Sequence, residues 1–143
     1  MIPLIQEQHE FEVTADGPSL IEITATIASW LDAMPARDGV LTVFLRHATG
    51  WLTIQDNASG SVRADLLAAL SQLNPNNSVY GSNDGSAGDI PAPIRAMLTS
   101  VSLTIPVIDG SMAVGPSQEV YLIEPRKRST PRAVLLHYIG SRG

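Results

Sequence analysis

The C-terminal third of the sequence constrains the fold most strongly, because three strand-like segments follow one another there without a helix between them. Residues 101–108, 119–124 and 132–139 are rich in β-branched and other apolar side chains. Asp109-Gly110 and nearby prolines supply turn residues between these segments. A doubly wound parallel sheet needs a helix after each strand, and this third of the chain has none to offer. The order therefore predicts a largely antiparallel sheet.

The first hundred residues mix the two hydrophobic periods. Alternation every second residue predicts strands, and apolar residues recurring every three or four positions predict helices. Strands are predicted over residues 9–14, 40–46 and 51–55, the last two as a pair, and helices over residues 21–34, 62–73 and 91–99. Together with the C-terminal strands, this predicts one α+β domain over residues 1–143, a largely antiparallel sheet or sandwich with helices packed on its outer face.

Composition excludes several classes of function. There is no cysteine, so a disulfide framework, a thiolate nucleophile and a cysteine-ligated metal are all impossible. A net charge of −5 disfavours nucleic-acid binding, which depends on a basic surface. No apolar run approaches the roughly 20 residues of a membrane span, and the N-terminal residues lack the pattern of a signal peptide, so we expect a cytoplasmic protein without membrane partners.

One basic cluster interrupts this acidic background. Its members are Arg126, Lys127, Arg128 and Arg132. The pattern favours the solvated tip of a hairpin and leaves open a local clamp for an anion.

His47 is the histidine that best fits a functional role, because it follows a predicted strand and enters a polar turn. A histidine there can exchange protons near neutral pH, and Arg46 and Thr49 can donate hydrogen bonds to an anionic group. A histidine that only holds the turn together is an equally good interpretation. His9 and His137 fall within predicted strands, which is typical of packed or surface side chains.

Two further polar segments could join such a site. Gln55 and Asp56 end a predicted strand, where they could orient a histidine or bind the water shell of a cation, or simply cap the following helix. Asp89 ends a glycine-rich loop before a predicted helix. The backbone of such a loop can bind an anion, although a capping Asp89 would itself occupy the amides and repel phosphate.

Taken together, the sequence resembles the YjbQ-like family, also described as the secondary thiamine-phosphate synthase family, over almost its whole length. The segments that carry the resemblance are IEIT at 21–24, DGVLTVF at 38–44, HAT at 47–49, LTIQDN at 52–57, SLTIPVIDG at 102–110 and GPSQ at 115–118. The resemblance implies the YjbQ-like fold, a homotrimer, and a site that includes Gln118 beside His47, Thr49, Gln55 and Asp56.

The departures from the family pattern bear most on function. Two further histidines of the family align near Gly81 or Ser82 and at Pro93, so that one of three histidines remains. Neither serine nor proline offers the nitrogen lone pair that binds a transition metal. We therefore expect no tightly bound metal and no cofactor.

Two functions fit this sequence. The first is a trimer without catalytic activity that binds a small anionic ligand, such as a phosphate ester, or another protein. The alternative is a transferase of the thiamine-phosphate synthase type that acts on a small phosphorylated metabolite. In that enzyme His47 and Asp56 are the catalytic residues and Arg46, Thr49, Gln55, Asp89 and Gln118 bind the substrate.

Overall fold

The structure is a computed structural model and describes residues 2–47, 49–56, 59–72, 100–125 and 131–143. Its helices are α1 (Thr24–Asp32) and α2 (Gly60–Gln72). Its strands are β1 (Leu4–Val13), β2 (Ser19–Glu22), β3 (Ala36–Leu45), β4 (Trp51–Asp56), β5 (Ser102–Ile108), β6 (Ser111–Met112), β7 (Gln118–Glu124) and β8 (Arg132–Arg142).

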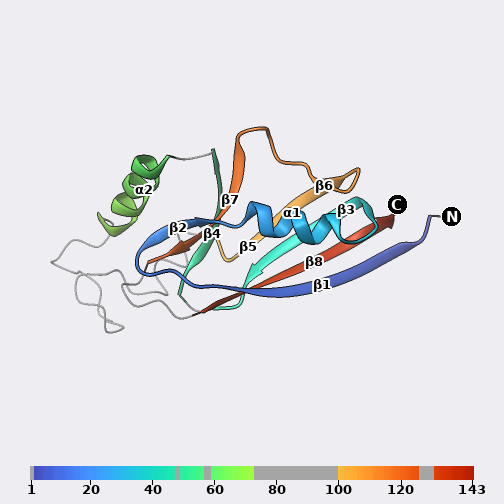
Figure 1. The fold of residues 1–143 in the computed structure, drawn as a ribbon, viewed down its shortest axis with the longest axis horizontal. Coiled ribbons are helices and arrows are strands. Elements are labelled where there is room, and N and C mark those ends of the chain that lie inside the picture. The colour runs from blue at the N-terminus through green and yellow to red at the C-terminus, as the bar shows by residue number, and fades with distance from the viewer. Residues whose placement is uncertain (1, 48, 57–58, 73–99, 126–130) are drawn as a thin grey trace.

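The described strands form two antiparallel sheets. The large sheet has the order β1-β8-β3-β5-β6 and the small sheet has the order β2-β7-β4. Figure 1 shows α1 lying along the large sheet, with α2 at the end of the molecule where the small sheet lies. The predicted α+β class is confirmed. Among the described residues, no helix is long and apolar enough to cross a membrane.

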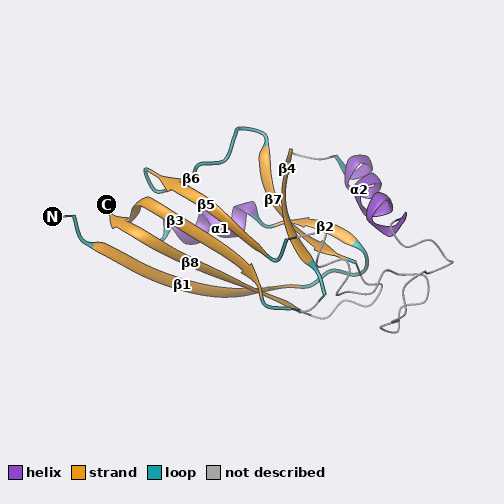
Figure 2. Cartoon of the chain, turned by 180° about the vertical axis from the view of Figure 1, so that it is seen from behind, coloured by secondary structure: helices purple, strands orange, loops and turns teal. Residues whose placement is uncertain are grey.

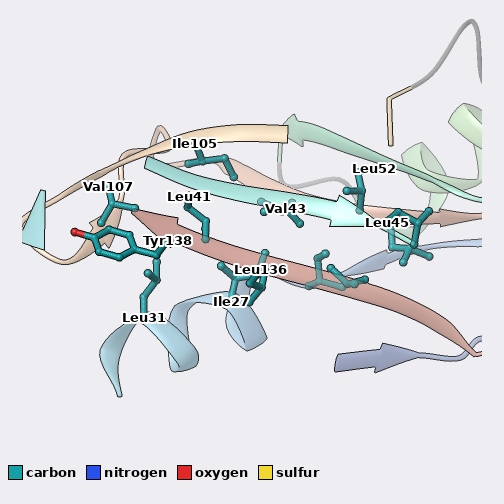
Figure 3. Packing of buried hydrophobic residues seen from close by; sticks show 14 residues of the cluster. Ile27, Leu31, Leu41, Val43, Leu45, Leu52, Ile105, Val107, Leu136 and Tyr138 are labelled. Carbon is teal, nitrogen blue, oxygen red and sulfur yellow. The ribbon is translucent and has the colours of Figure 1, made fainter. Parts of the chain in front are cut away.

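The main core lies on one face of the large sheet (Figure 3). Leu41, Val43 and Leu45 alternate along β3 and are almost completely buried, as the two-residue period of a strand requires. Ile27 and Leu31, one helical turn apart on α1, close over them. Each such side chain contributes about 1.5–3 kcal/mol when it is fully buried, so this face holds α1 on the sheet.

The small sheet is buried on both faces. Val120 and Leu122 of β7 belong to the main core, whereas Tyr121 points to the other side and joins a second cluster with Leu66 and Leu70 of α2. Helix α2 therefore packs on the outer face of the small sheet, as predicted for the helices. Helix α1 instead shares the core between the sheets.

The predicted pairing of residues 40–46 with 51–55 is wrong. Both segments are strands, but β3 belongs to the large sheet and β4 to the small one. The chain crosses between the sheets at Gly50, whose φ of 112° a residue with a side chain rarely adopts. Residues 100–101 also join the sheets, because Ser100 O accepts from Leu52 N and Val101 O accepts from Leu45 N.

The start of the predicted helix over residues 21–34 is also wrong. Ile21 and Glu22 belong to β2, where they lie opposite Leu122 and Tyr121, and the helix begins at Thr24. Thr24 Oγ1 accepts a hydrogen bond of 2.8 Å from Val120 N, which fixes this boundary. The apolar spacing continues through both elements, so periodicity alone did not separate them.

Two further predictions concern the turn at residues 109–110 and the helix over residues 91–99. The turn at Asp109-Gly110 is confirmed, with φ values of 51° and 83°, and it joins β5 to β6. The helix predicted over residues 91–99 lies outside the described residues.

Candidate functional site

His47 lies in the turn that connects β3 to β4. Thr49 N donates a hydrogen bond of 3.1 Å to Nδ1 of the ring, and Thr49 Oγ1 lies 3.2 Å from the same nitrogen. Thr49 is buried and His47 is half-buried. The two residues that the sequence placed in one turn are therefore held together within it.

A buried ion pair lies directly against this turn. Arg132 and Glu124 are each 1% exposed, and they form two parallel hydrogen bonds, Nε to Oε1 at 3.0 Å and Nη2 to Oε2 at 2.9 Å. Nη1 of Arg132 lies 2.8 Å from Nδ1 and 2.7 Å from Nε2 of His47. The end of β7, the start of β8 and the turn after β3 lie near one another in the fold (Figure 2). The contacts of Arg132 join these three segments in one polar network.

The position of Arg132 corrects the sequence interpretation of the basic cluster. Arg132 is neither the solvated tip of a hairpin nor a clamp for an anion, because Glu124 neutralises it in the interior. The other three members of that cluster lie outside the described residues. A buried arginine is stable only when its charge and its donors are matched, which the fork-shaped contact with Glu124 achieves.

The contacts of His47 define what its ring can do. Arginine has only hydrogen-bond donors, and an imidazole ring has at most one accepting nitrogen. Nδ1 is that acceptor, because Thr49 N donates to it, so of the two contacts with Arg132 only the one at Nδ1 can be a hydrogen bond. Nδ1 is therefore shared between the Thr49 N–H and the Arg132 guanidinium. General base catalysis needs an accepting nitrogen turned toward substrate; here the accepting side of the ring is engaged by the protein itself.

Arg46 points to another part of the molecule. Its Nη1 lies 2.9 Å from Oε2 of Glu10 on β1, and both side chains are substantially exposed. The guanidinium that was predicted to bind an anion beside His47 is therefore paired with a carboxylate of the large sheet.

The second predicted group lies at the opposite end of β4. Asp56 is exposed and lies opposite Gln118 of β7, and Gln55 lies opposite Glu119. Trp51, next to the His47 turn, and Asp56 are five residue steps apart along the strand, which corresponds to about 16 Å. The structure thus divides the predicted site residues into two groups.

The side chains of this second group have local partners. Gln118 Oε1 accepts a hydrogen bond of 2.7 Å from Gly115 N and so closes the turn before β7. Gln55 Nε2 donates to Thr53 Oγ1 at 3.1 Å. Asp89, like the positions near 81–82 and 93 where family histidines align, lies outside the described residues.

A cavity of about 310 Å³ lies between the small sheet and α2. Its walls include the apolar side chains of Leu20, Leu66, Leu70 and Ile123, and Thr53 and Gln55 line one part of it. This volume is at the lower end of the roughly 300–1,000 Å³ that is typical of small-molecule sites.

A charged cluster lies on the same outer face of the small sheet. Arg63 of α2 lies over the ring of Tyr121 at 4.9 Å, and its Nη2 is 3.7 Å from Oε2 of Glu22. Burial raises the pKa of Glu22 above its ordinary value of 4.5, and a hydrogen bond and repulsion from Glu119 raise it further, while Arg63 opposes the rise. Within the part of the chain that the structure describes, no group of three metal-binding side chains occurs.

Sequence reasoning missed Glu124 and the true role of Arg132. The sequence contains a signal for this pair. Glu124 is the last residue of one apolar strand and Arg132 is the first residue of the next, so the two opposite charges flank the same connection. Such a pair can meet across the connection between two consecutive strands, here strands of different sheets, and be buried together.

Comparisons with known proteins place this structure among relatives. A family model described as UPF0047 protein YjbQ-like matches residues 9–141. A UPF0047 protein of Synechocystis is 34% identical over 136 residues, covering 94% of this chain and 92% of the relative. The UPF0047 protein YjbQ of Salmonella typhimurium is 32% identical over 114 residues, covering 79% and 83%.

Solved structures agree on the fold. A YbjQ-like protein of unknown function from Sulfolobus solfataricus superimposes with a TM-score of 0.85 at 18% identity, covering 97% of this chain and all of the other. An uncharacterised protein of the YjbQ/UPF0047 family from Clostridium acetobutylicum gives a TM-score of 0.74 at 26% identity, covering 92% and 98%.

Proposed function

Because this chain belongs to the UPF0047 YjbQ-like family, we propose that it is a member without catalytic activity that binds a small molecule and assembles as a homotrimer. The observation that carries the proposal is the contact between His47 and the buried pair of Arg132 and Glu124. His47 is the one histidine that matches the family site in the resemblance, and it serves here to complete an internal network.

Chemistry as well as geometry supports the proposed absence of catalysis. Where the family has two more histidines, the resemblance aligns Gly81 or Ser82 and Pro93, none of which can exchange a proton near neutral pH. Asp56, the other expected catalytic residue, lies at the far end of β4 from His47. An acid–base pair has to reach one substrate from both sides, and these two side chains do not share one site within a subunit.

The cavity between α2 and the small sheet supports binding of a small molecule. It is concave, largely apolar, and provided with a few polar groups, which is the usual character of a ligand site. The described arginines near His47 are each paired with a carboxylate, so the anion site expected there has no unmatched cation to support it.

The outer face of the large sheet supports assembly. Val40, Phe44 and Ile139 are 40–45% exposed there, and Val40 lies directly opposite Ile139 on the neighbouring strand. Apolar side chains that line up on an uncovered sheet face are typical of a surface that is buried between subunits. A closed ring of identical copies buries this face without leaving an open end.

Two experiments test the proposal. Native mass spectrometry of the protein, purified without added ligand or chelator, measures the oligomeric state and any bound small molecule. An assay of coupling between the pyrimidine and thiazole precursors of thiamine phosphate measures catalytic turnover. We expect a trimer that carries a small molecule and shows no turnover. Turnover by the wild-type protein that is lost in His47→Ala would establish the alternative, a transferase with His47 as acid and base.

A further inference from the structure

The cavity between α2 and the small sheet limits the chemistry of its ligand. From its lining and from the charges beside it, we infer that it binds an uncharged, mostly apolar molecule that donates one hydrogen bond, and not a phosphate ester. This inference rests on the proposed function as a small-molecule binding protein and assigns the class of ligand.

The body of the cavity is apolar. Leu20 and Ile123 form its floor on β2 and β7, and Leu66 and Leu70 of α2 cover it. Among the described residues that line it, none carries a charge. Burial of apolar surface is therefore the main contribution to binding, and a charged group placed among these side chains would lose its hydration without gaining a partner.

One end of the cavity is polar and has a defined direction. Gln55 Nε2 donates to Thr53 Oγ1 at 3.1 Å, which fixes the amide so that Oε1 is the acceptor on its other side. Among the described residues, no donor to Gln55 Oε1 occurs. A ligand with an N–H or O–H at this end would supply that donor.

The charges beside this end oppose an anion. Glu119 lies directly opposite Gln55 on β7, so that both side chains project from the same face of the small sheet. Glu22 adds a second carboxyl group near Glu119, whose proximity raises the pKa of Glu22. Arg63 is the nearby cation, and it is tied to Glu22 and lies over Tyr121. An anionic ligand at Gln55 would thus lie beside like charge, whereas an uncharged one would not be repelled.

Two dyes of nearly the same shape test the inference. N-phenylnaphthylamine is uncharged and has one N–H, and anilinonaphthalene sulfonate adds a negative charge to the same frame. We expect the uncharged dye to bind the wild-type protein at one site per chain, at least about tenfold more tightly than the sulfonate. Equal or tighter binding of the sulfonate, or of inorganic phosphate at the same site, would overturn the inference and leave the proposed function standing.

Substitutions on α2 locate the site. Leu66→Trp fills the cavity and should weaken binding of the uncharged dye about tenfold, while Val62→Trp, one turn earlier on an exposed position, should change it less than about twofold. Equal effects of the two variants would refute the assignment to this cavity.

A measurement on the wild-type protein covers the case in which Leu66→Trp fails to fold. The side-chain amide signal of Gln55, assigned with Gln55→Leu, should shift on addition of the uncharged dye. An unshifted signal at saturation would refute the inferred contact, and absence of binding by either dye and of any co-purified molecule would contradict the proposed function as well.

Discussion

Arg132 and Glu124 form a buried ion pair with two parallel hydrogen bonds of 3.0 and 2.9 Å, which joins the start of β8 to the end of β7. The pair links the two sheets, because β8 belongs to the large sheet and β7 to the small one. Nη1 of the same arginine reaches His47, so a third segment is tied to the junction. A buried pair of opposite charges therefore lies at the junction of the two sheets.

Breaking this pair from one side should be strongly destabilising. We expect Arg132→Ala to lower the free energy of unfolding by about 3–5 kcal/mol, because the Glu124 carboxylate would remain buried without its partner. Urea denaturation measures the change. Arg46→Ala, which breaks the exposed pair with Glu10, should cost at most about 1 kcal/mol; a similar loss in both variants would contradict the structural role of Arg132.

His47→Ala should destabilise the protein without affecting its affinity for phosphate. The substitution removes the acceptor for Thr49 N and for Arg132, so we expect a loss of about 1–3 kcal/mol in the free energy of unfolding. Calorimetric unfolding and titration with inorganic phosphate measure the two quantities. An unchanged melting temperature with weakened phosphate binding would instead support His47 as a ligand-binding residue.

Phe44→Glu should dissociate the proposed trimer. Phe44 is 40% exposed on the outer face of the large sheet, and a carboxylate there would have to be buried between subunits. Sedimentation equilibrium at micromolar concentration should give a trimer for the wild-type protein and a monomer for this variant. Val62→Glu, at a position of similar exposure on α2, is the matched control and should stay trimeric. A monomeric wild-type protein would refute the proposed assembly.

Gly140→Ala should destabilise the large sheet at the pair of glycines, Gly39 and Gly140, that β3 and β8 place opposite each other. A Cβ at this position would overlap with Asp38 O, with the Tyr138 hydroxyl and with Gly39 Cα. The overlap has to be relieved by moving backbone, so we expect a loss of about 1–3 kcal/mol. Gly17→Ala has open space around it and should be close to neutral in the same thermal unfolding experiment. The contact geometry would be contradicted if the two variants melted together.

Glu22 should make stability fall as the pH rises above 4.5. Its pKa is raised in the folded protein by burial and by Glu119, so the folded state binds the proton more tightly than the unfolded state does. This contribution is fully present below about pH 4.5 and is lost as the pH passes through the raised value.

The variant Glu22→Gln isolates that contribution. Its free energy of unfolding should decline less than that of the wild-type protein over the same rise in pH, measured by urea denaturation. Glu12→Gln, an exposed substitution on β1, serves as the control and should follow the wild-type curve. Parallel curves for all three proteins would contradict the prediction.

Local chemistry made most of the elements predictable. Strands β5, β7 and β8 follow from runs of apolar and β-branched residues, and the turn at Asp109-Gly110 follows from residues that tolerate positive φ. Their approximate bounds needed no knowledge of partners, because alternation and turn propensity are properties of the segment itself.

The candidate site was predictable only in its local part. Thr49 and His47 are two residues apart, and their hydrogen bond forms within one turn. Arg132 is 85 residues from His47, and no local pattern indicates that the two meet. The separation of His47 and Asp56 was likewise not predicted. The two residues are close in sequence, but His47 precedes β4 and Asp56 ends it, so the length of this strand lies between them.

The sequence by itself determined that this protein is an α+β domain of antiparallel strands, that it cannot use cysteine chemistry, and that it resembles the YjbQ-like family. Periodicity, turn residues and motifs are short-range properties, and each can be read without knowing what lies across the fold. Only the tertiary structure decided that β3 and β4 separate into two sheets and that Glu124 neutralises Arg132 in the interior beside His47. Both features depend on residues that are far apart in sequence. A strand pairs with the strand that the complete fold places beside it, and a charge can be buried only where the fold places an opposite charge against it.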